Sequence, residues 1–117
     1  MKSLALAVLF AGSAWATDWQ HYRGPAQDGS TPEKVGAFAG SGPRELWRAQ
    51  LGTGLSSVTV AGGKVFSAGY KDGKEVLYCL DSANGKMLWM QAWPAKKGDN
   101  LFEGGPRVTP TVDSQRV

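Results

Sequence analysis

Residues 55–91 decide the fold, and they read LSSVTVAGGKVFSAGYKDGKEVLYCLDSANGKMLWMQ. Short runs of β-branched and aromatic residues alternate here with turn signals, which is typical of strands joined by tight turns. We expect strands over residues 55–60, 64–70, 75–81 and 86–91. The turns would be closed by Gly62-Gly63, Asp72-Gly73 and Asn84-Gly85, because such pairs reach positive φ angles at low cost. The stretch therefore predicts one antiparallel meander of four strands.

A second copy of this pattern begins near the C-terminus. Residues 57–65 (SVTVAGGKV) align without a gap on residues 109–117 (TPTVDSQRV), with Val60 on Val112. Trp47 and Trp89, each near the end of an expected strand, lie about 40 residues apart, which is the length of one four-stranded propeller blade. A four-stranded meander exposes apolar side chains on both faces, so it needs a neighbour on each side.

We therefore predict an all-β fold, a β-propeller of four-stranded antiparallel blades. About two incomplete blades fall within the chain, whereas closed propellers have roughly four to eight. The chain also stops where the second strand of the next blade is expected. We expect it to be a fragment of a longer protein.

The N-terminus has the pattern of an export signal. Lys2 precedes the apolar residues 4–11, and Ala14-Trp15-Ala16 offers the small residues of a cleavage site. This apolar run is shorter than the roughly 18 residues that a membrane-spanning helix needs. We expect a signal peptide at residues 1–16, an extended N-terminal segment at 17–45, and propeller blades at 46–117. Because no cysteine follows the expected cleavage site to carry a lipid, the prediction is a periplasmic or secreted bacterial protein with no stable membrane anchor.

Composition and spacing argue against several functions. The net charge is only +3, and the 13 Lys and Arg are spread along the chain, so nucleic-acid binding is not predicted. His21 is the sole histidine and Cys79 the sole cysteine. Neither has partners spaced for a catalytic triad or a zinc site. We predict no catalytic, cofactor-binding or metal-binding residue here, and we interpret Cys79 as a packed, inert thiol.

Residues 79–89 (CLDSANGKMLW) resemble the repeat of quinoprotein-type, PQQ-like β-propellers, in which Ala-x-Asp-x-x-Thr-Gly-Lys-x-x-Trp recurs once per blade. The matching positions are Asp81, Gly85, Lys86 and Trp89. Residues 19–25 (WQHYRGP) also resemble the start of secreted members. The resemblance implies that these residues shape the blade: Asp and Gly form the turn, and the Trp docks on the neighbouring blade. The copy upstream of Trp47 is degenerate, since Pro43 and Arg44 stand where Gly and Lys are expected.

The resemblance leaves more than one function open. We favour a non-catalytic binding or scaffold module that holds a protein or a small-molecule ligand through a propeller face, with no evident cofactor. The loop around residues 96–107 is the one candidate place for such binding in this stretch, whereas a solvated connector is the commoner role of a long polar loop. The alternative is the N-terminal part of a PQQ-dependent alcohol or sugar dehydrogenase, which would use PQQ with calcium and commonly an adjacent cysteine pair. A third relative, the outer-membrane assembly scaffold of the same fold, is usually a lipoprotein, and the missing lipidated cysteine argues against it.

Overall fold

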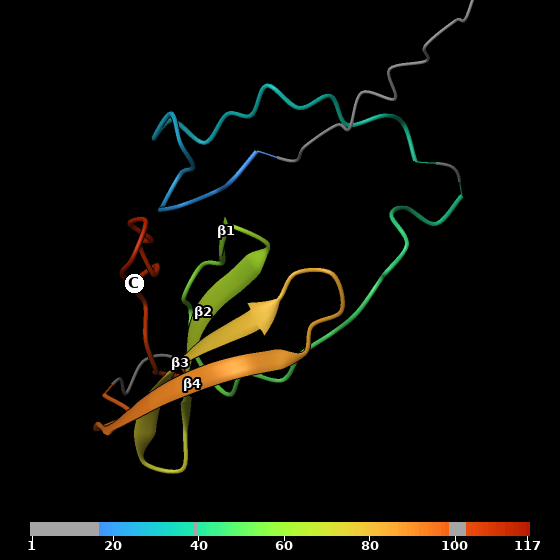
Figure 1. Ribbon diagram of the computed structural model, residues 1–117. Coiled ribbons are helices and arrows are strands. Elements are labelled where there is room, and N and C mark those ends of the chain that lie inside the picture. Colours follow the sequence, from blue (N-terminus) through green and yellow to red (C-terminus); the bar gives the residue numbers. More distant parts are fainter. Residues whose placement is uncertain (1–16, 39, 99–102) are drawn as a thin grey trace, which may run out of the picture.

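A computed structural model describes residues 17–38, 40–98 and 103–117, so the expected signal peptide lies outside the described residues. All four named elements are strands (Figure 1): β1 (Thr59–Ala61), β2 (Lys64–Lys71), β3 (Lys74–Asp81) and β4 (Met87–Pro94). They form one open antiparallel sheet in the order β1-β2-β3-β4. The prediction of an all-β chain with a four-stranded meander is confirmed. Among the described residues, no helix is long and apolar enough to cross a membrane.

Two of the three predicted turns close as expected. Gly62 and Gly63 have φ angles of 55° and 72°, and Asp72 and Gly73 have 51° and 76°. Positive φ at both central residues defines the turn whose twist matches that of the flanking strands. These local preferences fix the hairpins β1-β2 and β2-β3.

The third connection is longer than predicted. It spans residues 82–86, and only Gly85 in it has a positive φ angle, at 73°. The Asp81 N–H donates to the Lys86 carbonyl at 2.8 Å, and the Asn84 side chain accepts from the Lys86 N–H at 2.8 Å. Asn84 thus organises the turn through its side-chain oxygen rather than through a left-handed backbone.

The first strand was predicted too long at its start: residues 55–58 lie outside β1, and the first two of them bond to another segment. The Leu55 N–H donates to the Pro106 carbonyl at 2.8 Å, and the Ser56 hydroxyl to the Val108 carbonyl at 2.7 Å. Only three residues remain in β1. These long-range partners cannot be read from the local pattern.

The sheet packs through both faces. On one face Ala61, Phe66 and Cys79 form a buried cluster, against which the partly buried Val112 packs. On the other face the segment that precedes the sheet passes close to β2: a Cβ added at Gly69 would lie 1.7 Å from the Leu51 carbonyl oxygen.

Residues 18–20, the bridging segment, join the first strand to its counterpart in the second copy. Trp19 and Val60 exchange two backbone hydrogen bonds of 2.7 and 2.9 Å, and the Gln20 carbonyl accepts from the Val112 N–H at 2.8 Å. Immediately after Val112, Asp113 pairs with Arg116 in a short hairpin. That hairpin follows Val112 as the β1-β2 turn follows Val60, so the structure reproduces the start of the second copy.

The N-terminal segment beyond the bridging segment turns back on itself between residues 21 and 29 (Figure 1). The Gly24 N–H donates to the His21 carbonyl at 3.0 Å. Near its end the Asp28 carboxylate accepts from the Ser30 hydroxyl at 2.7 Å and from the Ser30 N–H at 2.8 Å. These hydrogen bonds favour the ionised form and lower the pKa of Asp28 below its ordinary value.

Candidate functional site

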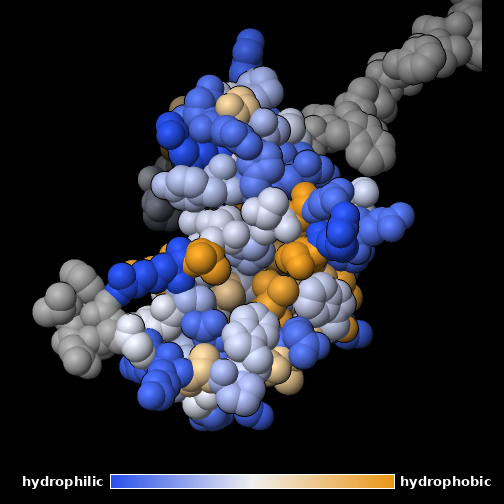
Figure 2. Space-filling view, turned by 90° about the vertical axis from the view of Figure 1, so that its left-hand side faces the viewer, coloured by the Kyte–Doolittle hydropathy of each residue, from blue (hydrophilic) through white to orange (hydrophobic). Residues whose placement is uncertain are grey.

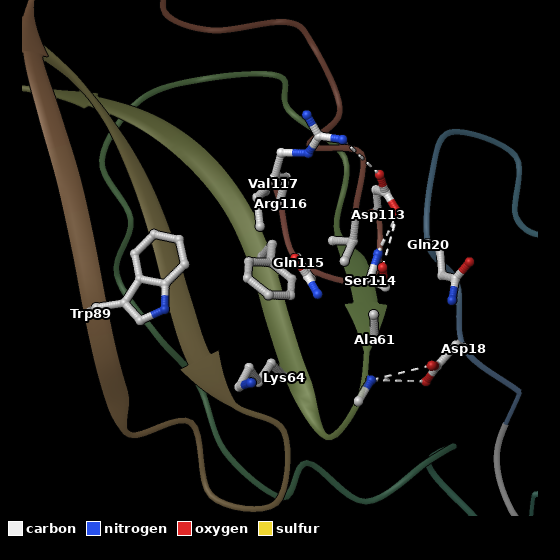
Figure 3. A pocket seen from close by; sticks show the side chains of 13 residues that line it. Asp18, Gln20, Ala61, Lys64, Trp89, Asp113, Ser114, Gln115, Arg116 and Val117 are labelled. Carbon is white, nitrogen blue, oxygen red and sulfur yellow. Dashed lines mark hydrogen bonds and ion pairs between the residues drawn. The ribbon is translucent and has the colours of Figure 1, made fainter.

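A pocket of about 380 Å³ opens between the sheet and the C-terminal hairpin (Figure 3). Trp89 extends toward it from β4, whereas Lys64 lines it from β2. Gln20 borders it on the bridging segment and Gln115 on the hairpin. The face that carries this hairpin is mixed in character, with apolar areas among polar side chains (Figure 2). The pocket combines an aromatic surface with dispersed amide and charged groups.

The two carboxylates of the pocket are engaged in local structure. The Asp18 carboxylate accepts from the Gly62 N–H at 3.2 Å. Asp113 forms an exposed ion pair with Arg116 at 3.5 Å. Within the described part of the chain, no three His, Cys, Asp or Glu side chains are grouped so that they could hold a metal ion.

The predicted blade motif is divided between two places. Asp81, Gly85 and Lys86 lie together at the β3-β4 connection, where the Asp81 carboxylate accepts from the Ala83 N–H at 2.8 Å. Trp89 lies on β4 at the pocket, 41% exposed, with its ring centroid 6.0 Å from that of Phe66. The structural role assigned to these four residues stays a prediction.

Trp47, from the copy that looked degenerate, docks on the β3-β4 connection. Its ring lies so close to Gly85 that an added Cβ would be 2.5 Å from the ring carbon Cε3. Its indole N–H donates to the Ser82 carbonyl at 2.9 Å. The spacing between Trp47 and Trp89 indicated that Trp47 belongs to the repeat. The motif around Trp47 was hard to recognise, because Pro43 and Arg44 stand where Gly and Lys are expected.

The other residues noted in the sequence are placed as follows. Cys79 is fully buried, which confirms that it is packed. Burial raises the pKa of its thiol, and its inertness stays a prediction. His21 is partly exposed, with its Nδ1 3.4 Å from the Tyr22 carbonyl. In the loop around residues 96–107, residues 99–102 lie outside the described part, and the Gly105 N–H donates to the Lys97 carbonyl at 3.0 Å.

Comparison with known families decides what kind of protein this is. The chain matches the PQQ_2 family model, described as outer membrane protein assembly factor BamB, over residues 32–117. The chain belongs to this family. No curated protein and no solved structure gives a significant match.

The PQQ_2 match confirms the resemblance to PQQ-like repeat proteins. It includes Trp47, the whole sheet and the hairpin after Val112, but not the bridging segment. The family description names an outer-membrane assembly factor. This is the kind of relative that the missing lipid-carrying cysteine argued against in the sequence.

Proposed function

We propose that the chain is a non-catalytic binding or scaffold module of the cell envelope, periplasmic or secreted, built from PQQ-like β-propeller blades. The match to a family described as an assembly factor supports this proposal most strongly. An assembly factor works by holding other proteins, which needs exposed surface rather than reactive groups. The chain supplies such surface on β4, where several large apolar side chains are between 41% and 59% exposed.

The propeller part of the proposal is supported by three contacts. Trp47 docks on the β3-β4 connection, as a preceding blade would. Val112 packs on the buried cluster of the sheet, as a following blade would. The bridging segment hydrogen-bonds to the first strands of both copies. Such contacts between consecutive repeats are what stabilise repeat architectures.

The described residues do not fit PQQ with calcium. They hold no group of three potential ligands, and Cys79 is a single buried thiol that cannot form an adjacent pair. No step through such a cofactor follows from them.

Two measurements on the purified full chain test the proposal. Incubated with PQQ and Ca²⁺ and offered primary alcohols or glucose, the chain should reduce an artificial electron acceptor no faster than a boiled sample. Immobilised on beads, it should retain an envelope protein in near-stoichiometric amount, whereas a heat-denatured sample should not. Turnover that depends on PQQ would favour the dehydrogenase, and equal retention by native and denatured chains would remove support for a scaffold.

Export is tested separately. Expressed with residues 1–16, the chain should be found in the periplasmic or culture fraction with Thr17 as its N-terminal residue. An unprocessed chain in the cytoplasm would contradict the proposed location.

A further inference from the structure

Strand β4 is the long outer edge of the sheet. It is eight residues long, with the sequence MLWMQAWP, and seven of these residues are exposed. In the described part of the chain, the hydrogen-bonded pairing of β4 is with β3 alone. Natural proteins usually protect such edges with charged side chains or a covering segment, because an unprotected edge pairs with other strands. β4 contains no charged residue, so this edge has the character of a pairing surface.

The register shows which backbone groups of β4 point outward. The Ala95 N–H donates to the Gly73 carbonyl at 3.1 Å. The pairing of β4 with β3 continues from this pair in the same register. Backbone groups alternate along an antiparallel pair, so those of Met90 and Ala92 point away from β3. Pro94 has the same orientation and lacks an N–H, as is usual for proline on an edge. The edge therefore offers donors and acceptors at Met90 and Ala92 and stops at Pro94.

Lysines lie at both ends of this uncharged strand. Lys86 immediately precedes it, Lys74 is paired with Pro94 at its other end, and Lys96 and Lys97 follow shortly after. All four side chains are exposed. A second copy of β4 in antiparallel pairing would bring these lysines against each other, which is unfavourable. A strand with acidic residues at both ends would instead meet opposite charge.

We propose that β4 is a strand-addition site for an extended segment of a partner protein, with an uncharged β-prone centre flanked by Asp or Glu. Addition of a strand to an open edge takes its affinity from backbone hydrogen bonds and its selectivity from side chains. The inference rests on the proposed scaffold function and names the kind of partner segment that the scaffold holds.

The test uses a synthetic peptide and the full chain. The peptide Glu-Asp-Val-Thr-Val-Thr-Val-Asp-Glu, labelled at its N-terminus, is titrated by fluorescence polarisation beside a twin with Lys and Arg in the acidic positions. We expect the acidic peptide to bind about tenfold more tightly than its twin. Hydrogen exchange should slow at the amides of Met90 and Ala92. Equal affinity of the two peptides, no binding by either, or protection at other amides only would overturn the proposal.

Two pairs of variants isolate the edge. Met90→Pro removes an outward N–H while leaving the hydrogen bonds to β3 intact, and Met90→Leu is its matched control. We expect the proline variant to lose binding about tenfold or more and the leucine variant to keep it. Should the proline variant fail to fold, Lys86→Glu with Lys96→Glu provides a second measure, since two Glu beside the remaining Lys74 and Lys97 cancel the flanking charge and should abolish the preference between the two peptides. An unchanged preference would contradict the charge argument.

The same variants separate this inference from the proposed function. If the immobilised chain retains an envelope protein and Met90→Pro retains it equally, the scaffold stands and the edge site falls. If neither the native chain nor the Met90→Pro variant retains an envelope protein, but the acidic peptide still binds the native chain at β4, the edge site stands and the scaffold function loses its support.

Discussion

Replacing Gly85 by alanine tests whether Trp47 docking holds the N-terminal segment on the sheet. The new Cβ would lie 2.5 Å from Cε3 and 2.7 Å from Cδ2 of the Trp47 ring. Real Cβ atoms do not approach carbon so closely, so the indole must move. Its hydrogen bond to the Ser82 carbonyl would be broken by that movement.

The expected magnitude has two parts. Alanine at the left-handed φ of 73° costs about 1–2 kcal/mol. Displacing a packed ring costs roughly 1–3 kcal/mol more. The free energy of unfolding should therefore fall by roughly 2–5 kcal/mol, and at about 4 °C per kcal/mol the Tm should fall by roughly 8–20 °C.

Gly62→Ala is the matched control. Gly62 also has a positive φ angle, of 55°, but nothing lies within 4 Å of the added Cβ. Thermal unfolding followed by circular dichroism should show only the backbone part of the loss in this variant. In a Trp47→Ala background, Gly85→Ala should cost no more than Gly62→Ala, because the clash is gone. If Gly85→Ala and Gly62→Ala lower the Tm equally in the native background, the docking argument is refuted.

Four further predictions follow from other contacts. In urea unfolding, Trp89→Ala should lower the free energy of unfolding by about 1 kcal/mol and Trp47→Ala by about 3 kcal/mol. The loss is smaller for Trp89 because its side chain is 41% exposed and makes fewer packing contacts. A larger loss for Trp89→Ala than for Trp47→Ala would contradict this. Buried Cys79 should resist iodoacetamide in the native chain, and modification as fast as in 8 M urea (about the usual unfolding concentration) would show the site to be open. Because the pKa of Cys79 is raised above its ordinary value of 9.0, the thiol ionises at a lower pH in the unfolded chain than in the folded chain. The free energy of unfolding should therefore fall as the pH rises above about 9, and Cys79→Ala should weaken this dependence on pH. Ser30→Ala should raise the pKa of Asp28 in an NMR titration, and an unchanged pKa would mean that the hydrogen bonds seen here do not persist in solution.

The parts of the fold that the sequence predicts are those in which a residue's own backbone preference decides. Gly62-Gly63 and Asp72-Gly73 form their turns because positive φ is cheap for these residues, and β2 follows the expected range almost residue for residue. The predicted start of β1 was wrong because Leu55 and Ser56 bond to a segment roughly 50 residues later, and such long-range pairing leaves no local trace.

The candidate site was less predictable for the same reason. Trp89 was recognised from the motif, but its position beside the hairpin after Val112 depends on how the two copies meet. The docking of Trp47 depends on Gly85, which lies far along the sequence in the β3-β4 connection. The outward-facing groups of β4 depend on sheet order and register, which strand propensity alone does not give.

The bridging segment also sets the order in which the chain can fold. Trp19 pairs with Val60, and Gln20 with Val112, which lies almost at the far end of the chain. Contacts of such long sequence separation form slowly, because a large loop must close before they contribute. The hairpins of the sheet can form as soon as residues 59–94 are available, whereas residues 18–20 reach their final place only once both copies are present. In a chain made from its N-terminus onward, residues 18–20 are thus made before both of their hydrogen-bonding partners and are among the last to be fixed.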